Sequence, residues 1–314
     1  MHRAAAPREA WIPVTSRLRL HVVEWGDPAG WPVIILHGGS HNAACWEDVC
    51  RRLPASLRLI VPDQRGHGAS DWSRRGVYSC AAQVRDLRRL IGALGCTEYA
   101  LVGHSMGGLN ALMFASGRSP GLRALALVDV GTETRRSGLA RVRQRPPLPQ
   151  VMSTQEALRM MRERYPRQTP RWWRRQIERE LRLVDGDTWR WGYDQRLARF
   201  VPAYGPDSAG RRRRAAAIRV PVLVVRGAHS RILSRGRAAV TARVTGGTVV
   251  EVPGAGHPVP LDNPRGLATA LRRFLMPLAQ EARRAAAARP VTRAARVRSD
   301  LPRQLEPEAL RRAC

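Results

Sequence analysis

The stretch Gly103-His104-Ser105-Met106-Gly107 places a serine between two glycines, where one sequence pattern gives way to another. The run before it, Tyr99-Ala100-Leu101-Val102, is apolar and short enough for a buried parallel strand, whereas residues 109–115 are rich in helix formers. A tight turn from strand to helix strains the backbone of its central residue, and flanking glycines let neighbouring segments pass closely. The pattern therefore predicts a serine hydroxyl exposed at a sheet edge, beside the positive end of a helix.

Three further motifs follow expected strands. Val33-Ile34-Ile35-Leu36 ends in His37-Gly38-Gly39-Ser40, and residues 248–252 lead into Pro253-Gly254-Ala255-Gly256-His257. Together with Asp63-Gln64-Arg65-Gly66-His67-Gly68-Ala69-Ser70, these motifs make the sequence resemble the α/β-hydrolase family from about residue 12 to about residue 276. The resemblance implies the α/β-hydrolase fold, a doubly wound and mostly parallel sheet with a helical cap inserted after strand 6.

The residue types at these motifs predict nucleophilic catalysis. A serine is a weak nucleophile at its ordinary pKa, so Ser105 needs a base, and histidine suits that task near neutral pH. We expect His257 to be that base. The resemblance implies that the backbone N–H groups of Gly39 and Met106 form an oxyanion hole, a device that typically contributes about 3 to 4 kcal/mol to transition-state stabilisation. It further implies structural roles for His37 and His104, and no metal or organic cofactor.

The third member of the expected triad departs from the common family pattern. Many family members carry an acid in the loop after the seventh strand, but residues 226–233 hold no carboxylate here, and Ser230 and Arg231 stand where an aspartate is usual. An arginine has the wrong charge to stabilise an imidazolium. Asp129, which follows the apolar run 124–128, is the candidate substitute, because some branches of the family place their acid there. The alternative is that Asp129 only bonds local backbone.

Composition limits the class of protein. A chain of 314 residues suits one large α/β domain with an insertion, and five cysteines without metal-ligand spacing favour a reduced, cytoplasmic setting. We expect no secretory signal and no membrane insertion. The formal net charge of +29 is compatible with a nucleic-acid binder, but all 54 basic residues are arginines scattered along the chain. We interpret this as genome composition and expect no specific nucleic-acid partner.

Strand-like and helix-like runs alternate along most of the chain, as a parallel sheet with helices on both faces requires. We expect the hydrolase core in residues 1–130 and 218–276, and an Arg- and Ala-rich tail in 277–314 that is either a solvated helix or disordered. Residues 131–217 show no convincing strand and predict the cap, with helices at 154–165, 170–184 and 187–200. The expected strands are 18–24, 33–36, 57–62, 99–102, 124–129, 222–225 and 248–252.

Aromatic residues gather in the expected cap, where specificity would be set. Trp172 and Trp173 are candidates to line an apolar acyl pocket, and Trp46, just after the oxyanion loop, is a candidate to line it from below. The alternative is that these rings attach the cap to the core.

The sequence thus predicts a serine hydrolase that cleaves a small-molecule carboxylic ester or lactone through an acyl-enzyme on Ser105. Two alternatives stay open: a ligand-binding homologue without efficient catalysis, suggested by the missing acid, and a carbon–carbon bond hydrolase.

Overall fold

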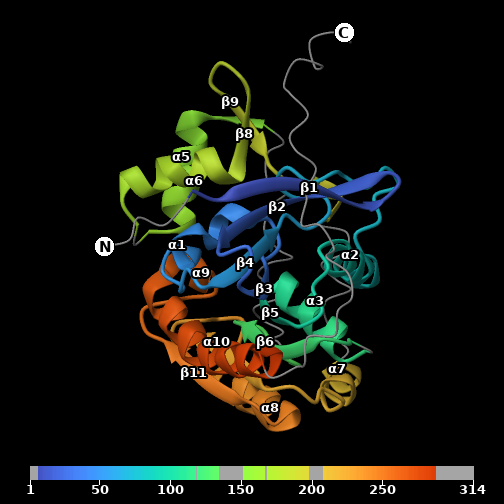
Figure 1. Ribbon diagram of the computed structural model, residues 1–314. Helices are drawn as coiled ribbons and strands as arrows, with labels where there is room; N and C mark the ends of the chain where they lie inside the picture. The colour runs from blue at the N-terminus through green and yellow to red at the C-terminus, as the bar shows by residue number, and fades with distance from the viewer. Residues whose placement is uncertain (1–5, 118, 134–150, 167, 198–207, 288–314) are drawn as a thin grey trace.

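The computed structural model describes residues 6–117, 119–133, 151–166, 168–197 and 208–287 (Figure 1). Its centre is an eight-stranded sheet of order β1-β2-β4-β3-β5-β6-β10-β11, in which β1 and β2 run antiparallel to their neighbours and the other pairs are parallel. The predicted mostly parallel sheet is confirmed. The strands are β1 (Arg8–Thr15), β2 (Leu18–Gly26), β3 (Trp31–Leu36), β4 (Leu57–Pro62), β5 (Tyr99–His104), β6 (Leu122–Val128), β10 (Val222–Gly227) and β11 (Thr248–Val252).

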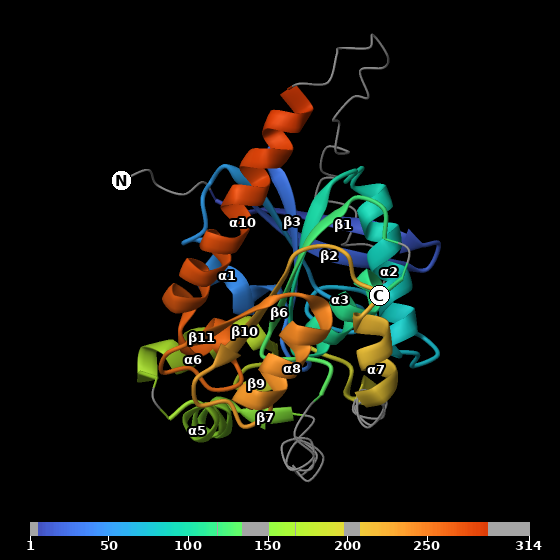
Figure 2. The same ribbon diagram turned by 90° about the horizontal axis from the view of Figure 1, so that it is seen from below.

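Helices cover both faces of this sheet, because successive strand residues point to opposite sides. Ile35 packs in a buried cluster with α1 (Glu47–Cys50) and α10 (Pro264–Ala287), whereas its neighbour Ile34 packs in a second cluster with α2 (Cys80–Ala93), α3 (Met106–Ala115) and α8 (Arg235–Thr245). Figure 2 shows α10 and α2 on opposite sides of the sheet. The sheet therefore separates two cores, and the parallel strands end together at one edge.

The structure adds a strand that the sequence analysis does not predict. β1 precedes the first expected strand and pairs with β2, and its residues alternate between more and less exposed. The other strands lie where they are expected, and two of them, 57–62 and 248–252, have the expected bounds.

The insertion between β6 and β10 contains strands as well as helices. We call residues 151–166 and 168–197 of this insertion the cap. It comprises β7 (Val151–Ser153), α5 (Thr154–Arg164), α6 (Pro170–Glu180), β8 (Leu181–Asp185) and β9 (Thr188–Trp191), with a three-stranded sheet of order β7-β9-β8.

The expectation of a strand-free, purely helical cap is therefore wrong. The second expected helix ends at Glu180, and β9 occupies the start of the third. A hairpin forms instead because Gly186 adopts a positive φ of 40° at the turn between β8 and β9.

Two boundaries also differ from the expected domains. Helix α7 (Ser208–Ala215), which falls in the expected cap range, packs against α3 and α8 of the core. Helix α10 continues past Met276 to Ala287, with Ala279 buried in the core. The expected helix end at Phe200 and residues 288–314 of the expected tail lie outside the described residues. Among the described helices, none is both long and apolar enough to span a membrane.

Candidate active site

Ser105 lies at the junction between β5 and α3 with a strained backbone, φ 51° and ψ −114°. The glycines on either side make this turn possible. A Cβ atom on Gly103 would lie 2.5 Å from the carbonyl oxygen of Gly107, and one on Gly107 would lie 2.5 Å from that of His37. The motif thus packs β3, β5 and α3 too closely for larger residues, and Ser105 itself is only half-buried.

His257 reaches Ser105 from the loop after β11. Its Nε2 lies 3.0 Å from the Ser105 Oγ, and its Nδ1 lies 2.7 Å from the Asp129 Oδ2. A carboxylate only accepts, so Nδ1 carries the proton and Nε2 is free to accept the serine proton. His104 fixes the loop, because its Nε2 donates to the His257 carbonyl oxygen at 2.8 Å.

Asp129 directly follows β6, has a positive φ of 50° and is fully buried. Its Oδ1 accepts the backbone N–H of Gly227 at 3.0 Å, and its Oδ2 accepts the Ser230 hydroxyl at 2.5 Å as well as the His257 Nδ1. The side chain of Arg231 is exposed. The structure therefore brings together the three residues Ser105, His257 and Asp129.

The backbones of Gly39 and Met106 lie side by side next to Ser105. A Cβ atom on Gly39 would be 3.9 Å from the Met106 Cβ. Neither N–H group donates to a backbone acceptor of the turns and loops within the described part of the chain. That these groups form an oxyanion hole stays a prediction. Ser40, at φ 66°, holds the turn that follows Gly39.

Two buried histidines frame this loop in their neutral forms. His37 accepts the Gln64 N–H on Nε2 at 2.9 Å and donates from Nδ1 to the Gly38 carbonyl oxygen at 2.8 Å. Burial lowers the pKa of His37 to about 4 and lowers the pKa of His104 well below its usual value. Each therefore acts as a fixed hydrogen-bonding group at neutral pH, which agrees with the structural roles that the resemblance implies.

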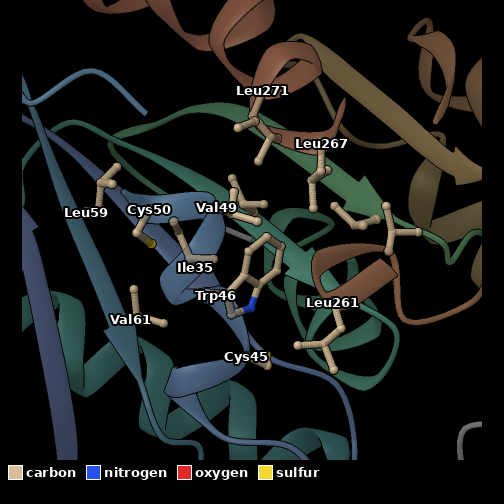
Figure 3. Close-up of a cluster of buried hydrophobic side chains, with 14 of the residues drawn as sticks. Ile35, Cys45, Trp46, Val49, Cys50, Leu59, Val61, Leu261, Leu267 and Leu271 are labelled. Atoms are coloured by element: carbon tan, nitrogen blue, oxygen red, sulfur yellow. The ribbon is translucent and has the colours of Figure 1, made fainter. Parts of the chain in front are cut away.

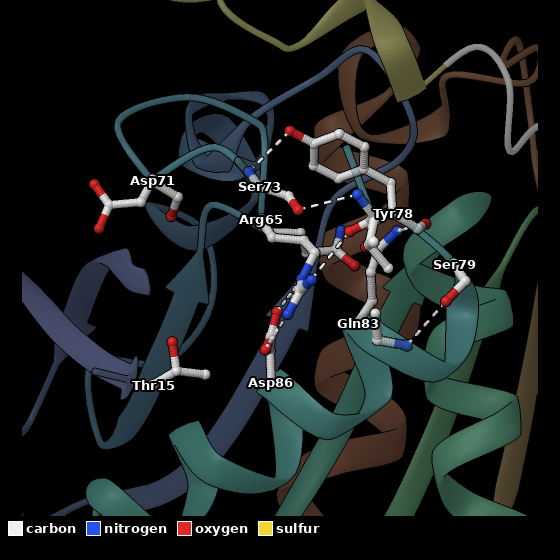
Figure 4. A network of polar contacts seen from close by, with 12 residues as sticks. Thr15, Arg65, Asp71, Ser73, Tyr78, Ser79, Gln83 and Asp86 are labelled. Atoms are coloured by element: carbon white, nitrogen blue, oxygen red, sulfur yellow. Dashed lines mark hydrogen bonds and ion pairs between the residues drawn. The ribbon is translucent and has the colours of Figure 1, made fainter. Parts of the chain in front are cut away.

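The motif 63–70 braces the oxyanion loop from the neighbouring strand. The buried Asp63 carboxylate accepts the backbone N–H groups of Ala43 at 2.6 Å and Ala69 at 2.8 Å, and a proton from His21 Nδ1 at 2.9 Å. Arg65 forms a buried ion pair with Asp86, which Figure 4 shows beside the contacts of Tyr78. This motif is structural, since its polar groups bond to one another and to neighbouring segments of the core.

The cap is attached to the loops around the site. Glu180 on α6 accepts a hydrogen bond from His41 Nδ1 at 3.1 Å, and Gly192 accepts one from the Gly68 N–H at 2.7 Å. Arg179 pairs with Glu47 on α1. A cleft of about 510 Å³ lies between the cap and β2. Its lining includes Glu180 but not Ser105, His257 or Asp129.

The three tryptophans proposed for the substrate pocket lie in different surroundings. Trp46 is fully buried, and Figure 3 shows its ring among Ile35, Val49 and leucines of α9 (Val259–Asp262) and α10. This packing accounts for Trp46 without any contact to a substrate. Trp172 and Trp173 are half-buried and both contact Tyr165. The ring of Trp172 meets the Tyr165 ring edge to face, with 5.0 Å between the ring centroids, and the Trp173 Nε1–H donates to the Tyr165 carbonyl oxygen at 3.0 Å. Their contact with a substrate stays a prediction.

Comparison with known proteins agrees with this geometry. Residues 33–270 match the alpha/beta hydrolase family. The chain belongs to this family. It is 33% identical over 289 residues to the 3-hydroxybutyrate-oligomer hydrolase of Cupriavidus necator, covering 86% of this chain and 99% of that protein. It is 30% identical to the 2-(acetamidomethylene)succinate hydrolase of Mesorhizobium japonicum, covering 83% and 92%.

Solved structures of similar fold include members of the same family. An alpha/beta hydrolase from Novosphingobium aromaticivorans is 30% identical and superposes with a TM-score of 0.75, covering 87% of this chain and 99% of that one. The family and these relatives identify this α/β hydrolase as a hydrolytic enzyme.

Two contacts at the site are missed by sequence reasoning. The Ser230–Asp129 hydrogen bond joins residues 101 positions apart, and the His41–Glu180 bond joins residues 139 positions apart. Only the first had a usable signal, because Ser230 occupies the loop in which an acid is usual.

Proposed function

We propose that this α/β hydrolase is a serine hydrolase that cleaves a carboxylic ester or lactone. The observation that carries the proposal is the chain of hydrogen bonds from Ser105 through His257 to Asp129, at 3.0 Å and 2.7 Å. These are the distances at which a base takes a nucleophile's proton. Ester cleavage also suits the name of the Cupriavidus relative, since 3-hydroxybutyrate oligomers are ester-linked.

The reaction proceeds in two steps. Ser105 Oγ attacks the substrate carbonyl while His257 Nε2 takes its proton, and the N–H groups of Gly39 and Met106 bind the oxygen that becomes negative. Asp129 holds the imidazole in the tautomer with its proton on Nδ1 and stabilises the imidazolium. His257 then gives its proton to the leaving alkoxide, and a water molecule activated by His257 hydrolyses the acyl-enzyme. In a lactone, the alkoxide stays tethered to the acyl group.

Under this proposal, the observation that suggested a ligand-binding homologue no longer supports that alternative. It rested on a missing acid, and a buried carboxylate lies against His257 from the end of β6 instead. A small-molecule substrate remains part of the proposal. So does a cytoplasmic location, which is supported by free cysteines in the described part of the chain, at Cys45, Cys50, Cys80 and Cys96.

A fluorophosphonate probe tests the proposal directly. We expect rapid, stoichiometric labelling that peptide mass spectrometry maps to Ser105, together with hydrolysis of p-nitrophenyl esters of graded chain length. A protein that hydrolyses none of these esters and labels slowly or at another residue would contradict the proposal. Preference for the acetate ester alone would count against an apolar acyl pocket under the cap.

A further inference from the structure

The loop after β10, residues 228–233, carries no carboxylate, yet it reaches the acid of the site with a hydroxyl. Ser230 is buried, with 5% of its surface exposed, and its Oγ lies 2.5 Å from the Asp129 Oδ2. Ser230 thus contacts the same carboxylate oxygen as His257.

The direction of this hydrogen bond is fixed by the rest of the loop. The Ser230 Oγ accepts the backbone N–H groups of Ile232 at 3.1 Å and Leu233 at 3.2 Å. A serine hydroxyl has two lone pairs and one proton, so with both lone pairs engaged the proton points to Asp129. Donors that polarise the oxygen also strengthen the bond that it donates.

Asp129 needs such a partner because its carboxylate is fully buried. A buried carboxylate is costly unless its oxygens accept hydrogen bonds. Gly227 occupies Oδ1, whereas Ser230 and His257 share Oδ2. Without Ser230, the Oδ2 atom would be held by the imidazole alone, whose ring must become charged and neutral again in each turnover.

The same loop packs against the loop that carries His257. The His229 N–H donates to the Ala255 carbonyl oxygen at 2.8 Å. A Cβ atom on Gly227 would lie 2.1 Å from the carbonyl oxygen of Gly256. Arg226 anchors the end of the loop by donating to the Leu233 carbonyl oxygen at 2.9 Å. Acid, serine and histidine are therefore held in one rigid arrangement.

We propose that Ser230 is a positioning residue, which orients the Asp129 carboxylate so that Asp129 can orient His257. The inference rests on the proposed function for its kinetic consequence, although the hydrogen-bond geometry does not. Loss of the hydroxyl leaves the Asp129 carboxylate free to turn away from its position against His257.

The test compares Ser230→Ala with a matched control, Ser234→Ala, in the same loop region. Ser234 caps α8 by accepting the Arg237 N–H and does not contact Asp129. For Ser230→Ala we expect kcat to fall about tenfold to hundredfold, the range that a hydrogen bond to a charged group supports, with KM little changed. The acidic limb of the pH–rate profile should move, because the carboxylate that contacts His257 has lost a hydrogen bond. Ser230→Thr, which keeps the hydroxyl, should retain the wild-type profile, and Ser234→Ala should lose only stability.

A second readout separates this inference from the proposed function. The downfield proton resonance of His257 Nδ1–H should shift in Ser230→Ala and not in Ser234→Ala, and its titration reports the imidazole pKa without any substrate. A wild-type kcat and an unmoved pH limb in Ser230→Ala would overturn the inference, as would an unmoved Nδ1 resonance. If the wild-type protein hydrolyses no ester but the resonance still shifts in Ser230→Ala, the proposed function would be contradicted and the positioning role would stand.

Discussion

The core strand ends and the cap differ in how directly local sequence determines them. In the core, Ser105 and His257 follow strands whose apolar runs are visible in the sequence, and the parallel pairing brings those strand ends to one edge. In the cap, α5 and α6 lie close to where helical patterns predict them, but the three-stranded sheet does not. The comparison teaches that the core strands are visible as continuous apolar runs, whereas the short cap strands depend on their partners.

The cap strands did leave a signal in the sequence. Leu181 and Leu183 lie on either side of Arg182, Trp189 and Trp191 lie on either side of Arg190, and Gly186-Asp187 is a two-residue hairpin turn. The pairs Leu181–Trp191 and Leu183–Trp189 face each other across the two strands. A period of two over only four or five residues is easily taken for part of a helix, and the cross-strand contacts decide the outcome.

The largest expected effect tests whether the chemistry belongs to the core alone. Ser105→Ala and His257→Ala should each lower kcat by about 10⁶-fold, and the double variant should lose little more, because the two residues act as one unit. The measurement is ester hydrolysis by protein whose fold is verified by circular dichroism. Substantial residual turnover in purified Ser105→Ala would place the nucleophile elsewhere.

Replacing the acid is the next largest change. Asp129→Asn keeps the shape, but it favours the wrong imidazole tautomer and removes the charge that stabilises the imidazolium, so kcat should fall by about four orders of magnitude. If Asp129 only bonds the Gly227 backbone, the loss should stay within about tenfold, or about 1.4 kcal/mol. Steady-state kinetics separates the two outcomes, and wild-type-like rates would leave a Ser105–His257 dyad.

Restoring a carboxylate on the loop after β10 sharpens the same point. Ser230 and Arg231 are the two positions at which an aspartate is usual in the family. Only Ser230 contacts Asp129, whereas Arg231 is exposed. In an Asp129→Asn background, Ser230→Asp should therefore regain at least about tenfold in kcat, worth about 1.4 kcal/mol of transition-state stabilisation. Arg231→Asp should regain nothing. Equal recovery by both variants would show that the loop rearranges.

The predictability of the site follows the same division. Ser105 and His257 could be predicted because glycines around them mark turns that only small residues permit. Asp129 could be proposed only through the family resemblance, since an aspartate at a strand end has no pattern of its own. Ser230 and Glu180 act through partners more than 100 positions away, and such pairing depends on the folded geometry, which one sequence does not specify.

The smallest expected effect concerns the contact between the cap and the core. Burial opposes ionisation of Glu180, but His41 at 3.1 Å and the nearby Arg164 outweigh it and lower the pKa of Glu180 below 4.5. A carboxyl whose pKa is lower in the folded state stabilises the fold above its unfolded pKa, and that stabilisation is lost as the pH falls through the folded value. Glu180→Gln should therefore cost about 1.5 to 3 kcal/mol of unfolding free energy at pH 7.

This cost should shrink as the pH falls below 4.5 toward the lower pKa of Glu180 in the folded protein, and kcat should change by less than tenfold because Glu180 does not touch the Ser105–His257–Asp129 chain. Urea unfolding at pH 7 and at pH 4 measures the difference. Glu178→Gln is the matched control, since Glu178 lies on the same helix with its side chain exposed. A cost that is equal at both pH values would mean that Glu180 contributes by shape and not by charge. A loss of kcat as large as that of Asp129→Asn would instead place the cap inside the catalytic machinery and remove the contrast between the two regions.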